Sequence, residues 1–204
     1  EYVLYADGRM EFSAPSYNSG LLSFPYKNYS WQVVSDTYNA IRQVDFSQGV
    51  FTATGAFSFK NCSNLRQVTL DNATTKIDRF SFENCKNLTS INLPTGLTLI
   101  AEGAFRYCEG LNCGLNLPNV TSVGDNAFES CAGLSTGVIL PQVKKLGVKA
   151  FAYCGNLTSA FIGGGTTIGN DAFNNCHSMT SLSLVDVTYI GNRAFSLCTG
   201  LTLG

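Results

Sequence analysis

Residues 123–134 read VGDNAFESCAGL, and this pattern decides the fold because it returns along the chain with a fixed period. It reads IAEGAFRYCEGL at residues 100–111, LGVKAFAYCGNL at 146–157 and IGNRAFSLCTGL at 190–201. Each copy begins with an aliphatic residue and carries alanine, phenylalanine, cysteine and leucine at matching places. Self-similarity at a period of about 20 to 50 residues is the signature of a repeat architecture. The sequence therefore predicts a solenoid of stacked units.

One cysteine marks each repeat, so the cysteines give the length of the unit. Successive members of this column are 22 or 23 residues apart. They are Cys62, Cys85, Cys108, Cys131, Cys154, Cys176 and Cys198. A phenylalanine stands three residues before each of them, from Phe59 to Phe195. Seven registers in two columns predict about seven repeats.

The segments within a repeat carry different structural signals. After the cysteine, apolar residues such as Leu88, Ile91 and Leu93 predict a short strand with one buried face. The phenylalanine–cysteine segment has the spacing of a short helix or 3₁₀ turn. Asn or Gly two residues after most cysteines, as at Asn87, predicts a left-handed turn there. One extra residue precedes the strand within residues 111–115 and again within 134–138, and the glycines there suggest bulges.

The repeat resembles the BspA-like leucine-rich repeats of bacterial and protist surface proteins, whose hallmark is I-G-x-x-A-F-x-x-C-x-x-L. The resemblance covers Ile41 to Gly204. It implies an α/β leucine-rich-repeat solenoid, a right-handed superhelix with a concave parallel sheet and short helices or 3₁₀ turns on the convex side. Residues 1–40 carry no period, and we interpret them as an N-terminal cap with short strands before a repeat domain at 41–204. Members of the family are typically secreted or attached to the cell surface, and many are implicated in adhesion.

The composition excludes several classes of function. The chain has 13 Lys and Arg against 14 Asp and Glu, a net charge of −1, and so lacks the positive charge that nucleic acids and anionic membranes attract. A membrane-spanning helix needs about 18 or more consecutive apolar residues, which the sequence does not contain, so we expect no membrane insertion by this chain. We expect any export signal and anchor to lie outside these residues.

No group of residues points to an enzyme, a cofactor or a metal. The cysteines occur once per repeat rather than in the close pairs of a zinc site, and we expect buried free thiols that act as small apolar groups. Cys113 lies off the register and is the thiol to test for reactivity. His177 follows Cys176 directly, so the two side chains should diverge and we expect an exposed histidine without a catalytic role. The run Gly163–Gly165 lacks the rest of a phosphate loop and reads as an ordinary turn.

The remaining candidate site is the concave face of the sheet, because residues between the inward positions of each strand point to solvent. The residues assigned to this face are Gln67, Thr69, Ser90, Asn92, Asn116, Ile139, Phe161, Ser181 and Ser183. Most are small and neutral, but Ile139 and Phe161 would form an apolar spot on adjacent strands. The stretch Ser159–Gly163 fits either phase of the strand, so the sequence leaves open whether Phe161 faces solvent or the core.

These observations favour a monomeric, secreted or surface-displayed adhesion module that binds a macromolecule, such as a host or matrix protein, through the concave face. A structural spacer that displays another domain is one alternative. A carbohydrate-binding accessory module is another, although glycan sites usually offer several aromatic side chains and this face offers only Phe161. A repeat fold by itself decides among none of these functions.

Overall fold

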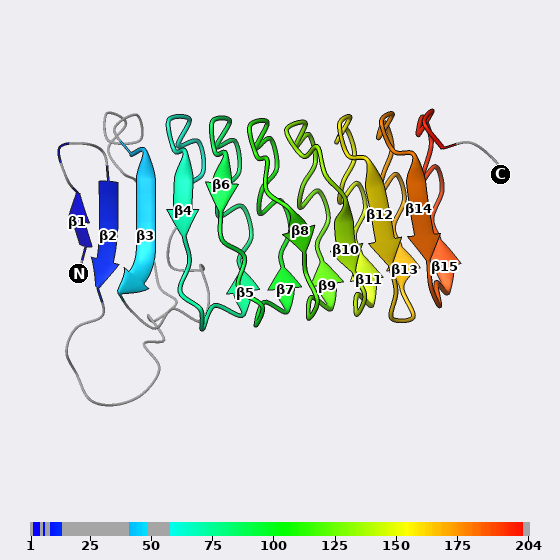
Figure 1. The fold of residues 1–204 in the computed structure, drawn as a ribbon, viewed down its shortest axis with the longest axis horizontal. Helices are drawn as coiled ribbons and strands as arrows, with labels where there is room; N and C mark the ends of the chain where they lie inside the picture. The colour runs from blue at the N-terminus through cyan, green and yellow to red at the C-terminus, as the bar shows by residue number, and fades with distance from the viewer. Residues whose placement is uncertain (1, 5, 7–8, 14–40, 49–57, 202–204) are drawn as a thin grey trace.

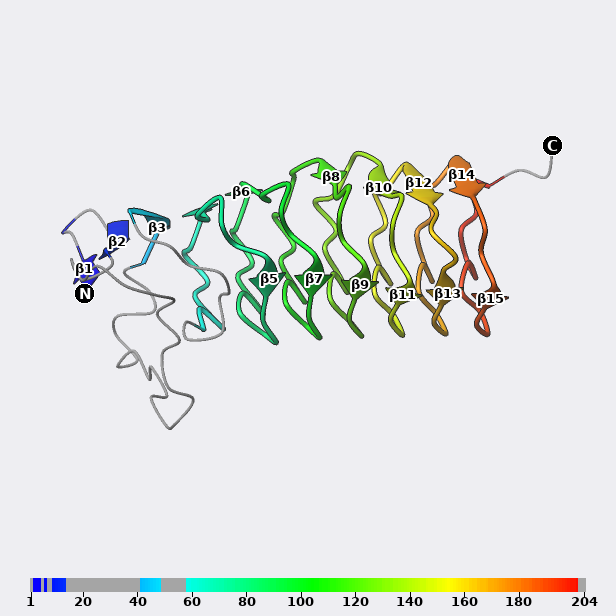
Figure 2. The ribbon, with the colours of Figure 1, turned by 90° about the horizontal axis from the view of Figure 1, so that it is seen from below.

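The computed structural model describes residues 2–4, 6, 9–13, 41–48 and 58–201. The chain winds through successive coils that follow one another in a nearly straight row (Figures 1 and 2). Each complete coil crosses two layers of short parallel strands, and the apolar side chains fill the space between the layers. The strands are short because only two to four residues of each repeat alternate between the core and solvent.

The first layer, here called the strand side, consists of two sheets. One sheet has the order β1-β2-β3-β4-β6 and contains Tyr2–Leu4, Arg9–Ser13, Gln43–Gln48, Gln67–Thr69 and Ser90–Ile91. The other has the order β14-β12-β10-β8 and contains Ser181–Leu184, Ser159–Ile162, Val138–Leu140 and Leu115–Asn116. β1 pairs with β2 antiparallel, and the other strands pair in parallel.

The second layer, here called the back sheet, was not anticipated from the sequence. It runs in the order β15-β13-β11-β9-β7-β5 and contains Tyr189–Ile190, Thr167–Ile168, Lys145–Leu146, Ser122–Val123, Leu99–Ile100 and Lys76–Ile77. Its register aligns the aliphatic residue that opens each repeat, for example Ile77 with Ile100 and Leu146 with Ile168. This sheet holds the coils at the same spacing on the back as on the strand side, which accounts for the nearly straight row in place of the expected concave curve.

The phenylalanine–cysteine segments form turns, and the described residues contain neither an α-helix nor a 3₁₀-helix. The expected short helices are therefore not found among the described residues, where hydrogen-bonded turns take their place. Alternate backbone N–H groups bond within the segment, as Cys108 N–H does to Phe105 O at 3.0 Å, while the others bond to the next coil, as Phe105 N–H does to Ala127 O at 2.8 Å. Hydrogen bonds that leave the segment at every second residue cannot build a helix, whose bonds all remain inside it.

The left-handed residues occupy a different place from the one expected. They stand directly before each cysteine, at Asn61, Asn84, Tyr107, Ser130, Tyr153, Asn175 and Leu197. A second set lies four residues earlier still, as at Asn126 with a φ of 55°. Two residues after the cysteine, Asn87 instead donates its side-chain amide to Ser63 O at 2.8 Å. At Gly110 a Cβ would lie 2.8 Å from Lys86 O, so close approach of neighbouring coils, rather than φ, favours glycine there.

A ladder of stacked rings runs through the core. The phenylalanines of successive repeats lie with centroids 4.9–5.8 Å apart and planes within 14° of parallel, from Phe59 to Phe195. Phe82 through Phe173 in this ladder are fully buried. Because each ring contacts the next, a single coil cannot bury its ring alone, and the core forms only when coils stack.

The strand side is interrupted between β6 and β8, where the sequence carries its first extra residue. Those two strands do not pair, whereas β8 and β10 pair regularly, with Leu115 opposite Val138. The predicted N-terminal cap falls for most of its length outside the described residues. Within residues 1–40 the structure shows the β1–β2 hairpin, which extends the sheet by parallel pairing of β2 with β3.

Candidate functional site: the strand face

The predicted binding residues all lie on the outer surface of the strand side, which faces solvent and is here called the strand face. Thr69 is half-buried, and the other eight predicted residues are exposed. Parallel pairing places several of them side by side across neighbouring strands. Asn116 lies opposite Ile139, Ile139 opposite Phe161, and Phe161 opposite Ser183. The structure thus joins the C-terminal members of the predicted site into one continuous row.

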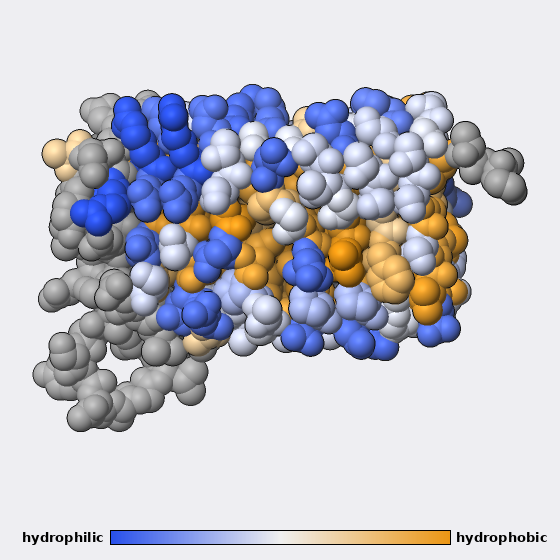
Figure 3. Space-filling view, in the orientation of Figure 1, coloured by the Kyte–Doolittle hydropathy of each residue, from blue (hydrophilic) through white to orange (hydrophobic). Residues whose placement is uncertain are grey.

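The structure resolves the orientation of Phe161. Its neighbours Ala160 and Ile162 are buried, so Phe161 points outward with 37% of its surface exposed. Ile139 is 44% exposed between the buried Val138 and Leu140. Large apolar side chains exposed on adjacent strands form an apolar pair on the surface. Figure 3, which views the strand face, shows apolar side chains along its middle and polar side chains along both margins.

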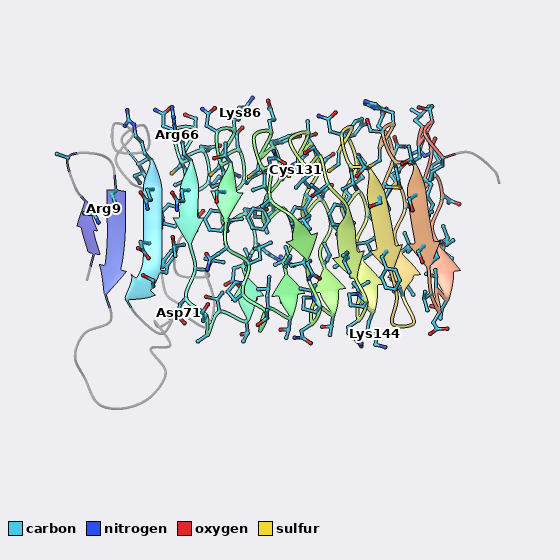
Figure 4. All side chains as sticks on the ribbon, in the orientation of Figure 1. Arg9, Arg66, Asp71, Lys86, Cys131 and Lys144 are labelled. Carbon is cyan, nitrogen blue, oxygen red and sulfur yellow. The ribbon has the colours of Figure 1, made fainter. Side chains whose placement is uncertain are left out.

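Charge divides the strand face into two halves. The N-terminal half carries charged residues: Asp45 lies in β3, Arg42 directly precedes β3, and Arg66 directly precedes β4. Figure 4 labels Arg66 and Lys86 along the upper margin. On this face, strands β8, β10, β12 and β14 carry no ionisable side chain, and the residues around the apolar pair are Ser, Thr, Asn and Gly. A surface of this kind can hold an apolar group of a partner and offer neutral hydrogen bonds around it.

Asn92 is exposed, but its side-chain amide is already hydrogen-bonded within the chain. Its Oδ1 accepts a hydrogen bond from Leu70 N–H at 2.5 Å, and its Nδ2 donates to Leu70 O at 2.9 Å. The side chain therefore continues the backbone ladder from β4 to β6 past the end of β6. Among the predicted binding residues, Asn92 is thus a structural residue, and spacing alone could not reveal this.

The cysteine column consists of free thiols, as the sequence predicts. Each thiol from Cys85 onward also donates a hydrogen bond to the carbonyl of a phenylalanine, a contact that the sequence reasoning missed. For Cys131 and Cys154 the acceptors are Phe105 O at 3.0 Å and Phe128 O at 3.1 Å. Burial raises the pKa of Cys62 and of Cys154 to about 12, so these two thiols are neutral at physiological pH.

The other candidates for chemistry remain isolated. Cys113 is half-buried, and burial raises its pKa to about 11, so its thiolate, the reactive form, is scarce at neutral pH. His177 is exposed and lies over Gly155 of the preceding coil. Gly164 and Gly165 adopt φ angles of 92° and 77° in a turn, where Lys144 Nζ donates to Gly164 O. Within the described residues no cluster of three or more His, Cys, Asp or Glu could hold a metal ion.

A ladder of ion pairs crosses the first four repeats at the position two residues before each cysteine. Lys60 Nζ lies 2.5 Å from Glu83 Oε2, and Arg106 Nε lies 2.6 Å from Glu129 Oε2. Arg106 also reaches Glu83, at 3.7 Å between Nη1 and Oε1, so it links the two pairs. Both glutamates are buried, whereas the lysine is exposed. The alternating signs in this column, Lys, Glu, Arg, Glu, could have revealed the ladder from the sequence.

This chain is similar to several solved structures of leucine-rich repeat proteins. One from T. pallidum is 24% identical, with a TM-score of 0.68, and the match covers 99% of this chain and 87% of that one. One from Eubacterium ventriosum is 19% identical, with a TM-score of 0.59, 81% of this chain and 55% of that chain being covered. A leucine-rich cell surface protein from Faecalibacterium prausnitzii is 23% identical, with a TM-score of 0.50 and coverage of 98% and 51%. At these identities the likeness shows the fold.

Comparison with curated proteins finds no significant match. No helix in the described part of the chain is long and apolar enough to cross a membrane. The family model that describes a BspA type leucine-rich repeat region, with six copies, matches residues 35–158 and 87–202. These overlapping matches cover the repeats that the cysteine column marks, together with the last residues before β3. The chain belongs to the BspA type leucine-rich repeat family.

Proposed function

We propose that this chain is a secreted or surface-displayed protein-binding module, and that it attaches to a host or matrix protein through the C-terminal half of the strand face. The observation that carries the proposal is the exposed pair of Ile139 and Phe161 within a charge-free surface. Large apolar side chains that lie exposed together in one patch often mark an interaction site.

The arrangement around the pair suits recognition of a protein surface. An aromatic side chain near the centre of an interface is a frequent source of binding energy, and neutral hydrogen-bonding groups around it exclude water. Ser181 and Ser183 flank Phe161 on one side, and Asn116 flanks Ile139 on the other. The parallel ladder holds their backbones in place, so little conformational entropy is lost on binding.

Display outside the cell is part of the same proposal. Its support is the family itself and the Faecalibacterium prausnitzii relative, which is described as a leucine-rich cell surface protein. The free thiols are compatible with such a location because most of them are buried, away from oxidants, and burial raises the pKa of Cys154, for example, to about 12.

The test is binding of the purified chain to a panel of extracellular-matrix proteins, cell-surface proteins and glycans. We expect a protein on the panel to bind the wild type and to lose at least tenfold in affinity for an Ile139→Asp/Phe161→Asp variant. Tyr153→Asp is the matched control, because Tyr153 is 46% exposed but lies on the cysteine turns. It should bind as the wild type does.

Three results would contradict the proposal. Binding that survives in the double variant would move the site away from the apolar pair. Absence of any bound protein would favour the spacer function, and a glycan that binds through Phe161 would favour the carbohydrate-binding function.

A further inference from the structure

The strand side is unpaired between β6 and β8, a place here called the break. The two strands do not pair, and Figure 1 shows β8 set lower than β6. Before the break, Asn112 N–H bonds to Thr89 O at 3.3 Å. After it, the next backbone bond between the two coils joins Thr121 N–H to Thr98 O at 2.9 Å. Backbone bonds thus hold the coils together on both sides of an unpaired stretch.

Backbone groups of both strands point toward the break. In a parallel ladder, successive residues direct their N–H and C=O groups alternately to the two neighbouring strands. Ser90 N–H bonds to a carbonyl of the preceding coil at 3.2 Å, so its successor Ile91 points to the break. Leu117 N–H bonds to Ile139 O at 3.0 Å, so Asn116 points away from β10 and also to the break.

The same alternation directs Leu93, two residues after Ile91, and Gly114, two residues before Asn116, toward the break. Neither the N–H nor the C=O of Leu93 or Gly114 bonds to another group in the described coils. Leu93 is half-buried, and polar groups below the surface are rarely left without a partner. Each of these residues therefore presents a donor and an acceptor side by side.

The surface beside the break has room for an approaching group. A Cβ at Gly114 would meet no atom within 4 Å, whereas a Cβ at Gly137, the equivalent residue of the next coil, would overlap Ser159 Oγ. Gly114 is also exposed. A side chain of another molecule can therefore approach the backbone groups of the break from solvent.

The back sheet limits what can enter the break. β7 and β9 stay paired behind it, with Ile100 opposite Val123, so the two coils remain about 4.8 Å apart on that side. Insertion of a whole strand between β6 and β8 would need about twice that spacing. The occupant must therefore be a small group that carries both a donor and an acceptor.

Asn92 shows on the neighbouring strand which group satisfies such a pair. Its carboxamide accepts a hydrogen bond from Leu70 N–H at 2.5 Å and donates one to Leu70 O at 2.9 Å. One planar group, with its donor and acceptor fixed side by side, thus takes the place of a paired strand. Leu93 and Gly114 offer the same combination of groups toward the break.

We propose that the break recognises a carboxamide side chain, an asparagine or glutamine of the protein that binds the strand face. This site rests on the proposed function, because Asn116 lies opposite Ile139 and the break therefore borders the apolar pair. The partner places an apolar group on Ile139 and Phe161 and its carboxamide about two strand spacings away, or about 10 Å. The carboxamide oxygen accepts from a backbone N–H at the break, and its nitrogen donates to a backbone carbonyl.

The test is a titration of the isotope-labelled wild type with acetamide, followed through the amide resonances in NMR spectra. The N–H resonances of Leu93 and Gly114 should shift and saturate. That of Gly165, which also bonds to no group in the described coils, should not saturate, because no second strand faces it. N,N-dimethylacetamide keeps the carbonyl but has no donor, and it should bind about tenfold more weakly. Shifts at Leu93 and Gly114 no larger than that of Gly165 would mean that solvent satisfies the break, and would overturn the proposal.

Gly114→Leu tests the same site by covering it. A Cβ fits at Gly114 without contact and the φ angle there is not left-handed, so the unfolding midpoint should stay unchanged. The acetamide shift at Leu93 should be lost. Thr158→Leu, which adds the same side chain at an exposed residue directly before β12, is the matched control and should retain the shift. A shift that persists in a folded Gly114→Leu would contradict the site.

Binding of a protein from the panel separates this site from the proposed function. Gly114→Leu should weaken that binding about tenfold, as should replacement of the partner's carboxamide residue by leucine. Binding that Ile139→Asp/Phe161→Asp abolishes but Gly114→Leu leaves unchanged would keep the function of the strand face and overturn the carboxamide site. If no protein binds, the protein-binding function fails, and the acetamide titration still decides whether the break binds a carboxamide.

Discussion

The thiol of Cys131 donates a hydrogen bond to the carbonyl oxygen of Phe105, 26 residues earlier, at 3.0 Å. The same contact recurs from Cys85 to Cys198, each time reaching from one coil to the one before. Cysteine combines a small apolar side chain with a weak donor. The thiol thus fills the core and satisfies part of a buried carbonyl at once.

Cys131→Ala should lower the free energy of unfolding by about 1–2 kcal/mol, because it removes a buried sulfur and its hydrogen bond. The carbonyl of Phe105 keeps its bond from Cys108 N–H, which limits the loss. Equilibrium unfolding in urea measures the change. Ser183→Ala, on the strand face, should stay within about 0.5 kcal/mol of the wild type. If Cys131→Ala lowered the free energy of unfolding by no more than Ser183→Ala does, the thiol and its hydrogen bond would contribute nothing measurable to stability.

The buried thiols should also make the protein sensitive to alkali. Burial raises the pKa of Cys154 from an ordinary 9.0 to about 12, so between these values the unfolded chain loses a proton that the folded chain retains. The stabilisation is complete below pH 9.0 and decreases as the pH rises toward about 12. Cys154→Ala should reduce the slope of unfolding free energy against pH in this range by about 1.4 kcal/mol per pH unit. An unchanged slope would contradict burial of this thiol.

Arg106 should matter more than an ordinary surface arginine because it lies between two buried glutamates. Arg106→Met leaves Glu83 and Glu129 without their shared partner, and we expect a loss of about 2–3 kcal/mol at neutral pH. Lys86→Met is the control, because Lys86 and Glu109 form a pair that is about half exposed on both sides. That variant should change stability by less than about 1 kcal/mol. Thermal and urea unfolding distinguish the two cases, and equal losses would argue against the ladder.

The stacked rings predict a large contrast between two phenylalanines. Phe128 lies between Phe105 and Phe151 at 5.1 and 4.9 Å and is fully buried. Phe128→Ala should cost about 3–5 kcal/mol. Phe161→Ala, on the strand face, should cost less than about 1 kcal/mol and affect binding instead. Similar losses for both variants would mean that Phe161 packs in the core.

Asn92 and Asn116 lie on the same face, but we expect only Asn92 to contribute to stability. Asn92→Ala removes both side-chain bonds to the backbone of Leu70, and we expect a loss of about 1–2 kcal/mol. Asn116→Ala should change stability by less than about 0.5 kcal/mol, because its exposed side chain points to solvent on the strand face. Hydrogen exchange at the amide of Leu70 should accelerate in the first variant alone. Protection that persists in Asn92→Ala would contradict the bridging role.

The sequence predicts the repeat length, the inward residues and the outward row of the strand face, because apolar periodicity records burial directly. Sequence-based prediction fails where a backbone N–H or C=O group has several possible hydrogen-bond partners. The segment around Phe105 has helical spacing, yet its N–H groups bond to the following coil. The left-handed residue before the cysteine is asparagine in some repeats but Tyr107, Tyr153 or Leu197 in others, so residue type does not locate it. The orientation of Phe161 required the register with Ile139, which depends on the extra residue in the preceding repeat.

The interruption between β6 and β8 has a mechanical consequence. On the strand side the ladder stops there, whereas on the back sheet β7 and β9 pair across the same boundary, with Ile100 opposite Val123. The strand side thus has no strand pairing at this boundary, whereas the back sheet is continuous across it. Bending should concentrate at this joint and open the strand face between Ser90 and Asn116. Such a motion would tilt the charged half of the face against the uncharged half while the back of the solenoid keeps its length.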